Sequence, residues 1–212
     1  MKILYIDTSS SYLYSAILED TKVLAEVKKE FGTSLSEESL PEIAILFEKA
    51  NLKPKEIEKI IVVNGPGSFT GIRIGITIAK TYAWALNIDI ITVNALEAMS
   101  ISCKEETNHV PIIDARRGYV FGAIYDKDSN VIFKPKHIQI EELDKEIEKL
   151  DNYTIISNNE LDHYINIVNY DPDISKIVEK TMDRTSLNPH AVNPEYLKLT
   201  EAEESKLNDN RV

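Results

Sequence analysis

The stretch "VVNGPGSFTGIRIG", residues 62–75, decides the fold of this chain, because a β-branched run ends in a glycine loop and an apolar helical pattern follows at once. Four of the seven glycines among the 212 residues lie in it. The run "KIIVVN" (59–64) is almost wholly apolar, which indicates a strand buried on both faces of a parallel sheet. Residues 72–87 then predict a helix. The loop therefore joins the carboxyl end of a buried strand to a helix N-terminus.

Three short strands and one helix precede this unit. Residues 2–7, 12–18 and 22–29 have the composition of strands, and the polar turns between them suit antiparallel hairpins. Residues 36–51 change to apolar residues at helical spacing. Strands that pair in a meander and then alternate with helices predict an α/β protein with a mixed sheet flanked by helices.

The strand-turn-strand pattern around Asp7 recurs later in the chain. At an offset of 107 residues, "IDTSSSYLYSAI" (6–17) and "IDARRGYVFGAI" (113–124) share Ile, Asp, Tyr, Ala and Ile. We interpret the match as an internal duplication that puts Asp7 and Asp114 at equivalent turns, with the join in the polar stretch 102–109. The predicted division is a first lobe at 1–100, a second, smaller lobe at 101–200 and a frayed tail at 201–212.

The composition narrows the class of protein. A chain with 43% apolar and 28% charged residues can bury a globular core. Its net charge of −11 repels a polyphosphate backbone, so we expect any nucleic acid to be held through a partner. One cysteine, Cys103, excludes an internal disulfide and fits a reducing compartment. No signal peptide or membrane-spanning run is evident, and we expect a cytoplasmic protein without a membrane role.

The glycine loop and the Asp7 turn are expected to meet. If the first strand lies beside the fourth, both segments follow the carboxyl ends of neighbouring strands, where open α/β sheets bind ligands. Backbone N–H groups at the N-terminus of the next helix favour an anion there. The alternative is structural, since glycines also let two backbone segments cross closely. The candidate nucleotide- or anion-binding residues are Asp7, Thr8, Ser9, Gly65, Gly67, Ser68, Thr70 and Asp114.

The loop does not match the common catalytic motifs. Its spacing is neither the GxxxxGK[ST] of a P-loop nor the GxGxxG of a dinucleotide site. A nucleophile elbow needs glycines on both sides of Ser68, where this chain has Pro66 and Thr70, so a serine hydrolase is disfavoured. The four histidines show no HxxxH or HExxH spacing, and we predict no metal-binding site in the chain itself.

The two aspartates and the second hairpin leave alternatives open. Asp7 and Asp114 can coordinate magnesium through water in a nucleotide cleft, or they can cap their own turns. The second-lobe hairpin carries Arg116 and Arg117 where a phosphate clamp needs small residues. These side chains can grip a phosphate from a distance, or they can fill the cleft or meet a partner. We favour filling or a partner contact.

The helix at 72–87 carries more apolar residues than one buried face requires. A helix that is apolar on two faces needs a core on one side and a partner on the other. We therefore expect it to form a subunit interface together with the helix at 36–51, and we expect the isolated chain to form a homodimer through the same surface. The predicted interface residues are Ile72, Arg73, Ile74, Ile76, Ile78, Tyr82, Ile43 and Phe47.

These motifs resemble a known family. "DTSS" after the opening strand, "NGPGSFTGIRIG" before an apolar helix, "IIDARRGYVF" near mid-chain and a late "NPEYLK" look like the TsaB family, which serves bacterial synthesis of threonylcarbamoyladenosine in tRNA. The resemblance covers residues 1 to about 125 and resumes near 190–200. It implies an actin-like, Hsp70-like (ASKHA) fold of two related lobes. It also implies a subunit that has lost independent catalysis and pairs with its larger relative TsaD, together with the ATPase TsaE, while TsaC supplies threonylcarbamoyl-adenylate.

The function expected from this resemblance is that of a non-catalytic scaffold and activator for TsaD, in the modification of the tRNA adenosine next to the anticodon. No cofactor is then required by this chain alone, ATP and magnesium are used by the partner subunits, and tRNA is met only through the complex. The alternatives are a nucleotide-dependent phosphotransferase that uses Asp7 and Asp114, and a peptidase. The arginines of the second hairpin count against the first alternative, and the missing GxSxG counts against the second.

Overall fold

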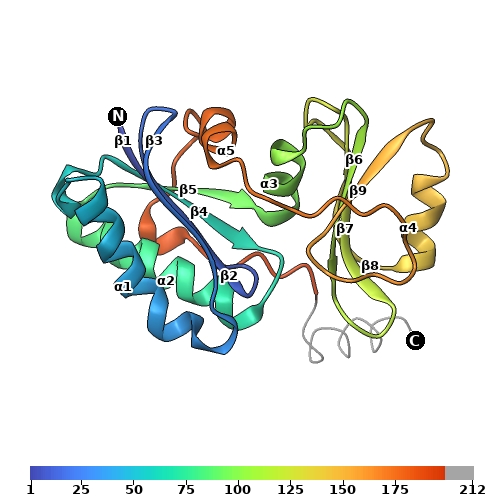
Figure 1. Cartoon of the computed structure of the whole chain (residues 1–212), viewed down its shortest axis with the longest axis horizontal. Coiled ribbons are helices and arrows are strands. Elements are labelled where there is room, and N and C mark those ends of the chain that lie inside the picture. The colour runs from blue at the N-terminus through green and yellow to red at the C-terminus, as the bar shows by residue number, and fades with distance from the viewer. Residues whose placement is uncertain (199–212) are drawn as a thin grey trace.

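The structure is a computed structural model that describes residues 1–198, so the predicted tail at 201–212 lies outside the described residues. The described chain folds into two mixed sheets with helices packed on them (Figure 1). The elements of the first part are β1 (Lys2–Asp7), β2 (Tyr12–Glu19), β3 (Lys22–Glu30), α1 (Leu35–Lys49), β4 (Lys59–Gly65), α2 (Phe69–Leu86), β5 (Ile90–Asn94) and α3 (Ala95–Ser102). Those of the second part are β6 (Asn108–Asp114), β7 (Tyr119–Tyr125), β8 (Val131–Gln139), α4 (Ile140–Ile147), β9 (Tyr153–Ile156) and α5 (Ile174–Thr181).

The two sheets repeat one topology. The strand order is β3-β2-β1-β4-β5 in the first and β8-β7-β6-β9 in the second. In each sheet the leading strand pairs antiparallel with the strand that follows it and parallel with a later strand, as β1 does with β2 and β4, and β6 with β7 and β9. This shared order confirms the predicted α/β fold of two related lobes.

Helices cover both faces of the first sheet, and one of them lies between the two sheets. α1 and α2 lie side by side on one face of the first sheet, and α3 and α5 cover the other face (Figure 1). α3 lies between the two sheets: Ala95 and Ala98 pack against the first, while Leu96 and Met99 pack against the second. The predicted lobe boundary at residue 100 falls within this helix. Among the described helices, none combines the length and apolar character needed to cross a bilayer.

Asp7 and Asp114 end the leading strands of the two sheets at equivalent turns, as predicted, but the registers of the two hairpins differ by one residue. Asp7 pairs with Tyr14 across the first hairpin, but the residue opposite Phe121 in the second is Ile113. Asp7 and its partner Tyr14 are seven positions apart, whereas Ile113 and its partner Phe121 are eight apart, so the second hairpin is one residue longer. Because successive strand residues face opposite sides, Asp7 shares the α3–α5 side with Tyr5, while Asp114 is displaced to the opposite side.

The helix predicted at 72–87 is confirmed as α2, with an earlier start. The side-chain oxygen of Ser68 accepts the N–H of Gly71 at 3.2 Å and so caps the first turn. The helix ends where Asn87 adopts a left-handed conformation with φ 54°. The glycine loop is therefore shorter than the sequence suggested, and Phe69 and Thr70 belong to the helix.

Candidate functional site

A cleft of about 1320 Å³ opens between the two lobes. Its first-lobe wall includes the turn after β1, residues 28–36 and the start of α2, and its second-lobe wall includes the turn after β6 and residues 158–159. Most of the predicted ligand-binding residues line it, namely Asp7, Ser9, Gly67, Ser68, Thr70 and Asp114. Thr8 is fully buried behind the wall, and Gly65 lies against the backbone of Glu195. The structure thus brings the predicted segments together, and their binding of a ligand stays a prediction.

Asp7 lies at the floor of the cleft and is only 2% exposed. Its Oδ1 accepts hydrogen bonds from the backbone N–H of Ser9 at 2.8 Å and from the Ser9 hydroxyl at 2.7 Å. Burial raises the pKa of the Asp7 carboxyl above its ordinary value, although the two bonds from Ser9 lower it. No ion pair to Asp7 is present among the described residues. The charged form is therefore unfavourable in the folded chain.

Replacing Asp7 by asparagine tests this electrostatic cost. The amide keeps an oxygen that accepts the bonds from Ser9 but carries no charge, so we expect the free energy of unfolding at pH 7.5 to rise by about 1 kcal/mol or more. Because the pKa of Asp7 is higher in the folded chain than in the unfolded chain, the wild type loses stability as pH rises through the folded-state pKa, whereas the asparagine variant does not. The difference in the free energy of unfolding between the two proteins should therefore shrink towards pH 4.5. Urea unfolding at both pH values measures it. An equal difference at both pH values would contradict the assignment.

The glycine loop is packed tightly against the Asp7 turn. A Cβ atom at Gly67 would lie far inside 3.0 Å of the Ser9 carbonyl oxygen, and one at Gly71 would do the same with the Thr8 carbonyl oxygen. The Ser68 N–H donates to that Ser9 oxygen at 2.7 Å, and the Thr8 hydroxyl donates to the Gly71 carbonyl at 2.7 Å. These contacts support the structural alternative, in which glycines allow two backbone segments to cross. Neither glycine has room for a side chain, and both still line the open cleft.

The second-lobe turn is capped by its own aspartate. Asp114 is exposed, and its Oδ1 accepts the backbone N–H of Arg116 at 2.8 Å. Arg116 and Arg117 both have left-handed backbone angles, with φ 68° and 57°. Arg116 lines the cleft, whereas Arg117 is exposed and is not part of the wall. The structure thus gives the Asp114 side chain the turn-capping role, which was one of its two predicted alternatives. Of the two predicted arginines, Arg116 lines the cleft. Among the described residues no cluster of three His, Cys, Asp or Glu is arranged to hold a metal ion.

A tyrosine cluster beside Asp7 was missed by the sequence analysis. Tyr14 and Tyr170 line the cleft with their rings edge to face at 5.8 Å, and Tyr5 is buried beneath them. The hydroxyl groups of Tyr5 and Tyr170 are buried without a hydrogen-bond partner in the described chain. Burial raises the pKa of all three phenols, and the nearby Asp7 adds to this effect. The floor of the cleft therefore combines a buried carboxyl group with phenols that stay protonated.

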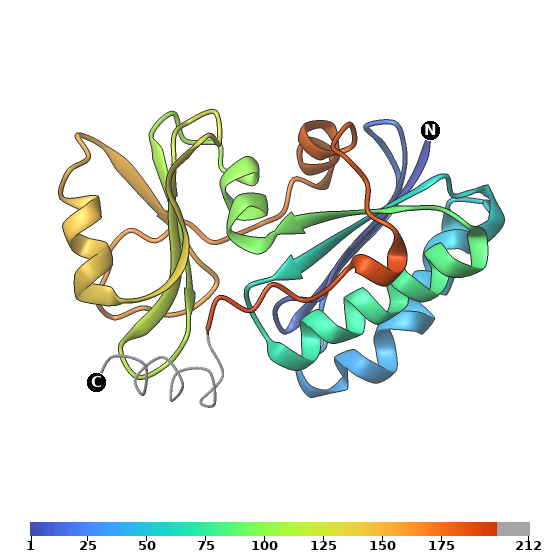
Figure 2. The ribbon, with the colours of Figure 1, turned by 180° about the vertical axis from the view of Figure 1, so that it is seen from behind.

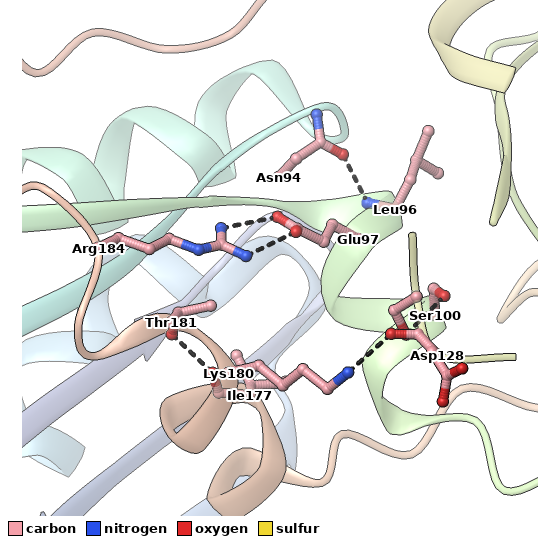
Figure 3. Close-up of polar contacts among 10 residues, drawn as sticks. Asn94, Leu96, Glu97, Ser100, Asp128, Ile177, Lys180, Thr181 and Arg184 are labelled. Atoms are coloured by element: carbon pink, nitrogen blue, oxygen red, sulfur yellow. Dashed lines mark hydrogen bonds and ion pairs between the residues drawn. The ribbon is translucent and has the colours of Figure 1, made fainter. Parts of the chain in front are cut away.

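Polar contacts surround α3 on the side where α5 packs, and one of them joins the two lobes. Figure 3 shows the guanidinium of Arg184 donating to both carboxylate oxygens of Glu97, at 2.9 and 2.7 Å. It also shows the Lys180 ammonium of α5 donating to the Asp128 carbonyl in the β7–β8 turn, at 2.7 Å. Lys180 belongs to a helix packed on the first sheet and Asp128 to the second lobe, so this contact bridges the lobes. The side chain of Asn94 caps α3 by accepting the Leu96 N–H at 2.9 Å.

The predicted interface residues divide into core and surface. Four of them, Ile43, Phe47, Ile72 and Ile76, are buried in the first lobe's own core. Ile74, Ile78 and Tyr82 are half-buried against the same core, and Arg73 is exposed. The surface available to a partner is therefore set by other apolar side chains. We define the α1–α2 face as Leu40, Ile45, Phe69, Arg73 and Trp84.

The α1–α2 face is unusually apolar for a free surface. Phe69 is 56% exposed and Trp84 is 71% exposed, and with Arg73 they follow one side of α2 at helical spacing. Leu40 and Ile45 are exposed on α1, but they are five positions apart and lie on different sides of that helix. Tyr82 is the side chain of α2 that stacks on Phe47 of α1, whereas Phe69 and Arg73 contact Tyr196 on the other side of α2. Trp84 is the single tryptophan of the chain, and tryptophan is enriched at the centres of protein interfaces. Its presence in this helix is the sequence signal that could have identified this face.

Comparisons with known proteins agree with this geometry. The family model described as "TsaD: tRNA N6-adenosine threonylcarbamoyltransferase" matches residues 28–203. The tRNA threonylcarbamoyladenosine biosynthesis protein TsaB of Bacillus subtilis is 30% identical over 221 residues, covering 96% of each chain. The TsaB protein of Escherichia coli is 32% identical over 136 residues, covering 63% of this chain and 58% of its own.

A solved structure shares the fold. A Pseudomonas aeruginosa protein, described as similar to the peptidase YeaZ, superposes with a TM-score of 0.74 over 93% of this chain and 99% of its own, at 16% sequence identity. Identity at that level supports the fold alone, whereas the match along nearly the whole length of the Bacillus subtilis protein establishes kinship. The chain therefore belongs to the TsaB family of tRNA threonylcarbamoyladenosine biosynthesis proteins.

Proposed function

We propose that this chain is a non-catalytic scaffold and activator subunit that pairs with TsaD, together with TsaE, for threonylcarbamoylation of the tRNA adenosine next to the anticodon. The observation that carries the proposal is the exposed side of α2 within the α1–α2 face, where Phe69 and Trp84 follow the same side of the helix as Arg73. Exposed aromatic residues with arginine are typical of protein interfaces. Because the family model of TsaD matches this chain, a related two-lobed subunit is the natural partner.

The cleft supports a subunit without chemistry of its own. A side chain at Gly67 or Gly71 would meet the chain's own carbonyl groups, and the floor of the cleft holds a buried carboxyl group among phenols. In this proposal the chain needs no cofactor alone, and ATP with magnesium serves the partner subunits.

Reconstitution tests the function. Purified TsaD and TsaE from the same source, supplied with threonylcarbamoyl-adenylate, ATP, magnesium and unmodified tRNA, should form threonylcarbamoyladenosine only when this chain is added. Mass spectrometry of the digested tRNA measures the product. Equal product without the chain, or no stable complex with TsaD, would contradict the proposal.

The isolated chain should hydrolyse ATP at a negligible rate. The second hairpin carries Arg116 and Arg117 where a phosphate clamp needs small residues, and the Asp114 carboxylate caps its own turn, so we expect turnover far below the roughly 1 per second of a slow enzyme. Steady-state release of phosphate measures it, with the TsaE partner as a positive control. Turnover near 1 per second that is lost on replacing Asp7 by asparagine would favour the phosphotransferase alternative.

The isolated chain is also expected to self-associate through the α1–α2 face, because this surface has no partner in the monomer. A two-fold dimer would bury the same residues from both copies. Sedimentation at tens of micromolar should show a dimer, and added TsaD should replace it with a heterodimer. A strict monomer at that concentration would contradict this expectation.

A further inference from the structure

Three side chains form a rigid stack at the start of α2. The guanidinium of Arg73 lies 3.9 Å from the centre of the Phe69 ring, and the ring of Tyr196 stacks on Phe69 at 5.1 Å with an interplanar angle of 24°. The Nε of Arg73 donates to the Tyr196 hydroxyl at 2.7 Å. We call these three residues the Arg73 platform. A planar guanidinium held on an aromatic face loses little further freedom when it binds a ligand.

The segment that carries Tyr196 is fixed by its own contacts. The N–H of Glu195 donates to the Asn64 carbonyl at 2.8 Å, and the amide of Asn94 donates to the Glu195 carboxylate at 3.0 Å. The ammonium of Lys80 on α2 donates to the Val192 carbonyl at 3.0 Å. Figure 2 shows this last described segment running beside α2 towards the second lobe. The platform is therefore formed before any partner binds.

The platform presents unused donors. An arginine carries five N–H donors, of which Tyr196 takes the one on Nε. In the described part of the chain, the Nη groups of Arg73 make no hydrogen bond or ion pair. Two parallel N–H groups at the end of an exposed guanidinium match the two oxygens of a carboxylate.

We propose that the Arg73 platform binds an aspartate or glutamate side chain of the TsaD partner and anchors the α1–α2 face on it, an inference that rests on the function proposed above. The guanidinium would hold the carboxylate by two hydrogen bonds, while Phe69 and Tyr196 shield the pair from water. Charge-assisted pairs of this kind are strong when they are desolvated, and they set the register of an interface.

A protein carboxylate fits the surroundings better than an RNA phosphate does. The chain carries a net charge of −11, and the first turn of the adjacent α1 is acidic, with Glu37 and Glu38. Such a surface repels a polyanion but accepts one carboxylate at one arginine. Trp84, exposed on the same side of α2 as Arg73, is apolar, which suits a protein surface and not a phosphate backbone.

Three substitutions test the proposal, with the Kd for purified TsaD as the measurement. Arg73→Gln should weaken binding by about a hundredfold, because the pair is lost. Arg73→Lys should weaken it nearly as much, since an ammonium cannot make the two parallel bonds. Tyr196→Phe keeps the ring and loses the hydroxyl, and should weaken binding by about three- to tenfold. Lys22→Gln, at an exposed cation on the far end of β3, is the matched control and should change nothing.

A second arm identifies the partner group. Exposed Asp and Glu residues of TsaD are replaced one at a time by Asn or Gln. One of these replacements should weaken binding to the wild-type chain by about a hundredfold, but it should not weaken binding to the Arg73→Gln variant any further. Unchanged melting temperatures exclude a folding defect as the cause. Wild-type binding with an unaffected Arg73→Gln would overturn this inference alone, whereas no binding by the wild type would overturn the proposed function as well. If the Arg73 variants lost tRNA binding but kept TsaD binding, the platform would bind an RNA phosphate, and the proposal of a protein carboxylate would be overturned.

Discussion

Replacing Gly71 by alanine is expected to lower the free energy of unfolding by about 3 kcal/mol or more. A Cβ at this position would press on the Thr8 carbonyl oxygen, which is backbone at the end of β1 and cannot move away as a side chain could. The same change displaces the Gly71 carbonyl that accepts the Thr8 hydroxyl at 2.7 Å. Because a domain of this size is stable by only about 5–15 kcal/mol, the variant should melt far below the wild type. Urea unfolding followed by circular dichroism measures the difference.

A glycine elsewhere provides the matched control. Gly118, at the second-lobe turn, has φ +77°, and a Cβ there would meet nothing within 4 Å. Asparagine tolerates this left-handed conformation, so Gly118→Asn should cost well under about 1 kcal/mol. If Gly71→Ala cost no more than this control, the glycine loop would not be a tight backbone crossing.

Placing a lysine at Trp84 is expected to weaken TsaD binding by about 3 kcal/mol, or roughly a hundredfold in Kd. Trp84 is 71% exposed, so the monomer loses little packing, and lysine is a good helix former in the last turn of α2. In the complex the ammonium would be buried without a counter-charge. Titration calorimetry with TsaD measures the change, and sedimentation should show a matching loss of the homodimer.

The matched control for that change lies in the second lobe. Ile165 is 83% exposed in the segment between β9 and α5, and Ile165→Lys adds the same charge without touching the α1–α2 face. It should bind TsaD as the wild type does. A charge at Ile74 or Ile78 would be a weaker test, because both pack partly against the lobe's own core and the monomer would suffer too. Equal binding by Trp84→Lys and Ile165→Lys would remove the α1–α2 face from the account.

The unit from β4 to α2 could be predicted from sequence because its signals are local. A continuous apolar strand, a glycine loop and a helical period follow one another without interruption, and the structure has them in that order. The internal repeat likewise identified the duplicated sheet. Local periodicity showed that α2 is apolar on two sides, but it could not tell which side faces inward. Ile72 and Ile76 therefore entered the predicted interface, although both lie in the core.

Non-local geometry set the limits of prediction. The register of a hairpin depends on the length of its turn, and a turn longer by one residue moved Asp114 to the opposite side of its strand from Asp7. The tyrosine floor needs Tyr5 and Tyr170, which are far apart in sequence and meet because the segment after β9 returns to the first lobe. The Arg73 platform needs Tyr196 in the same way. None of these contacts leaves a periodic pattern.

Hydrogen–deuterium exchange of this chain with and without TsaD tests the central claim most directly. If the chain is a scaffold that pairs through α1 and α2, then backbone amides of peptides covering residues 40–48 and 69–86 should exchange more slowly in the complex, while those of β8 and α4 keep their rates. The Trp84→Lys variant should lose this protection at the same TsaD concentration. Protection confined to the second lobe, or no protection when TsaD is present in excess, would contradict the account.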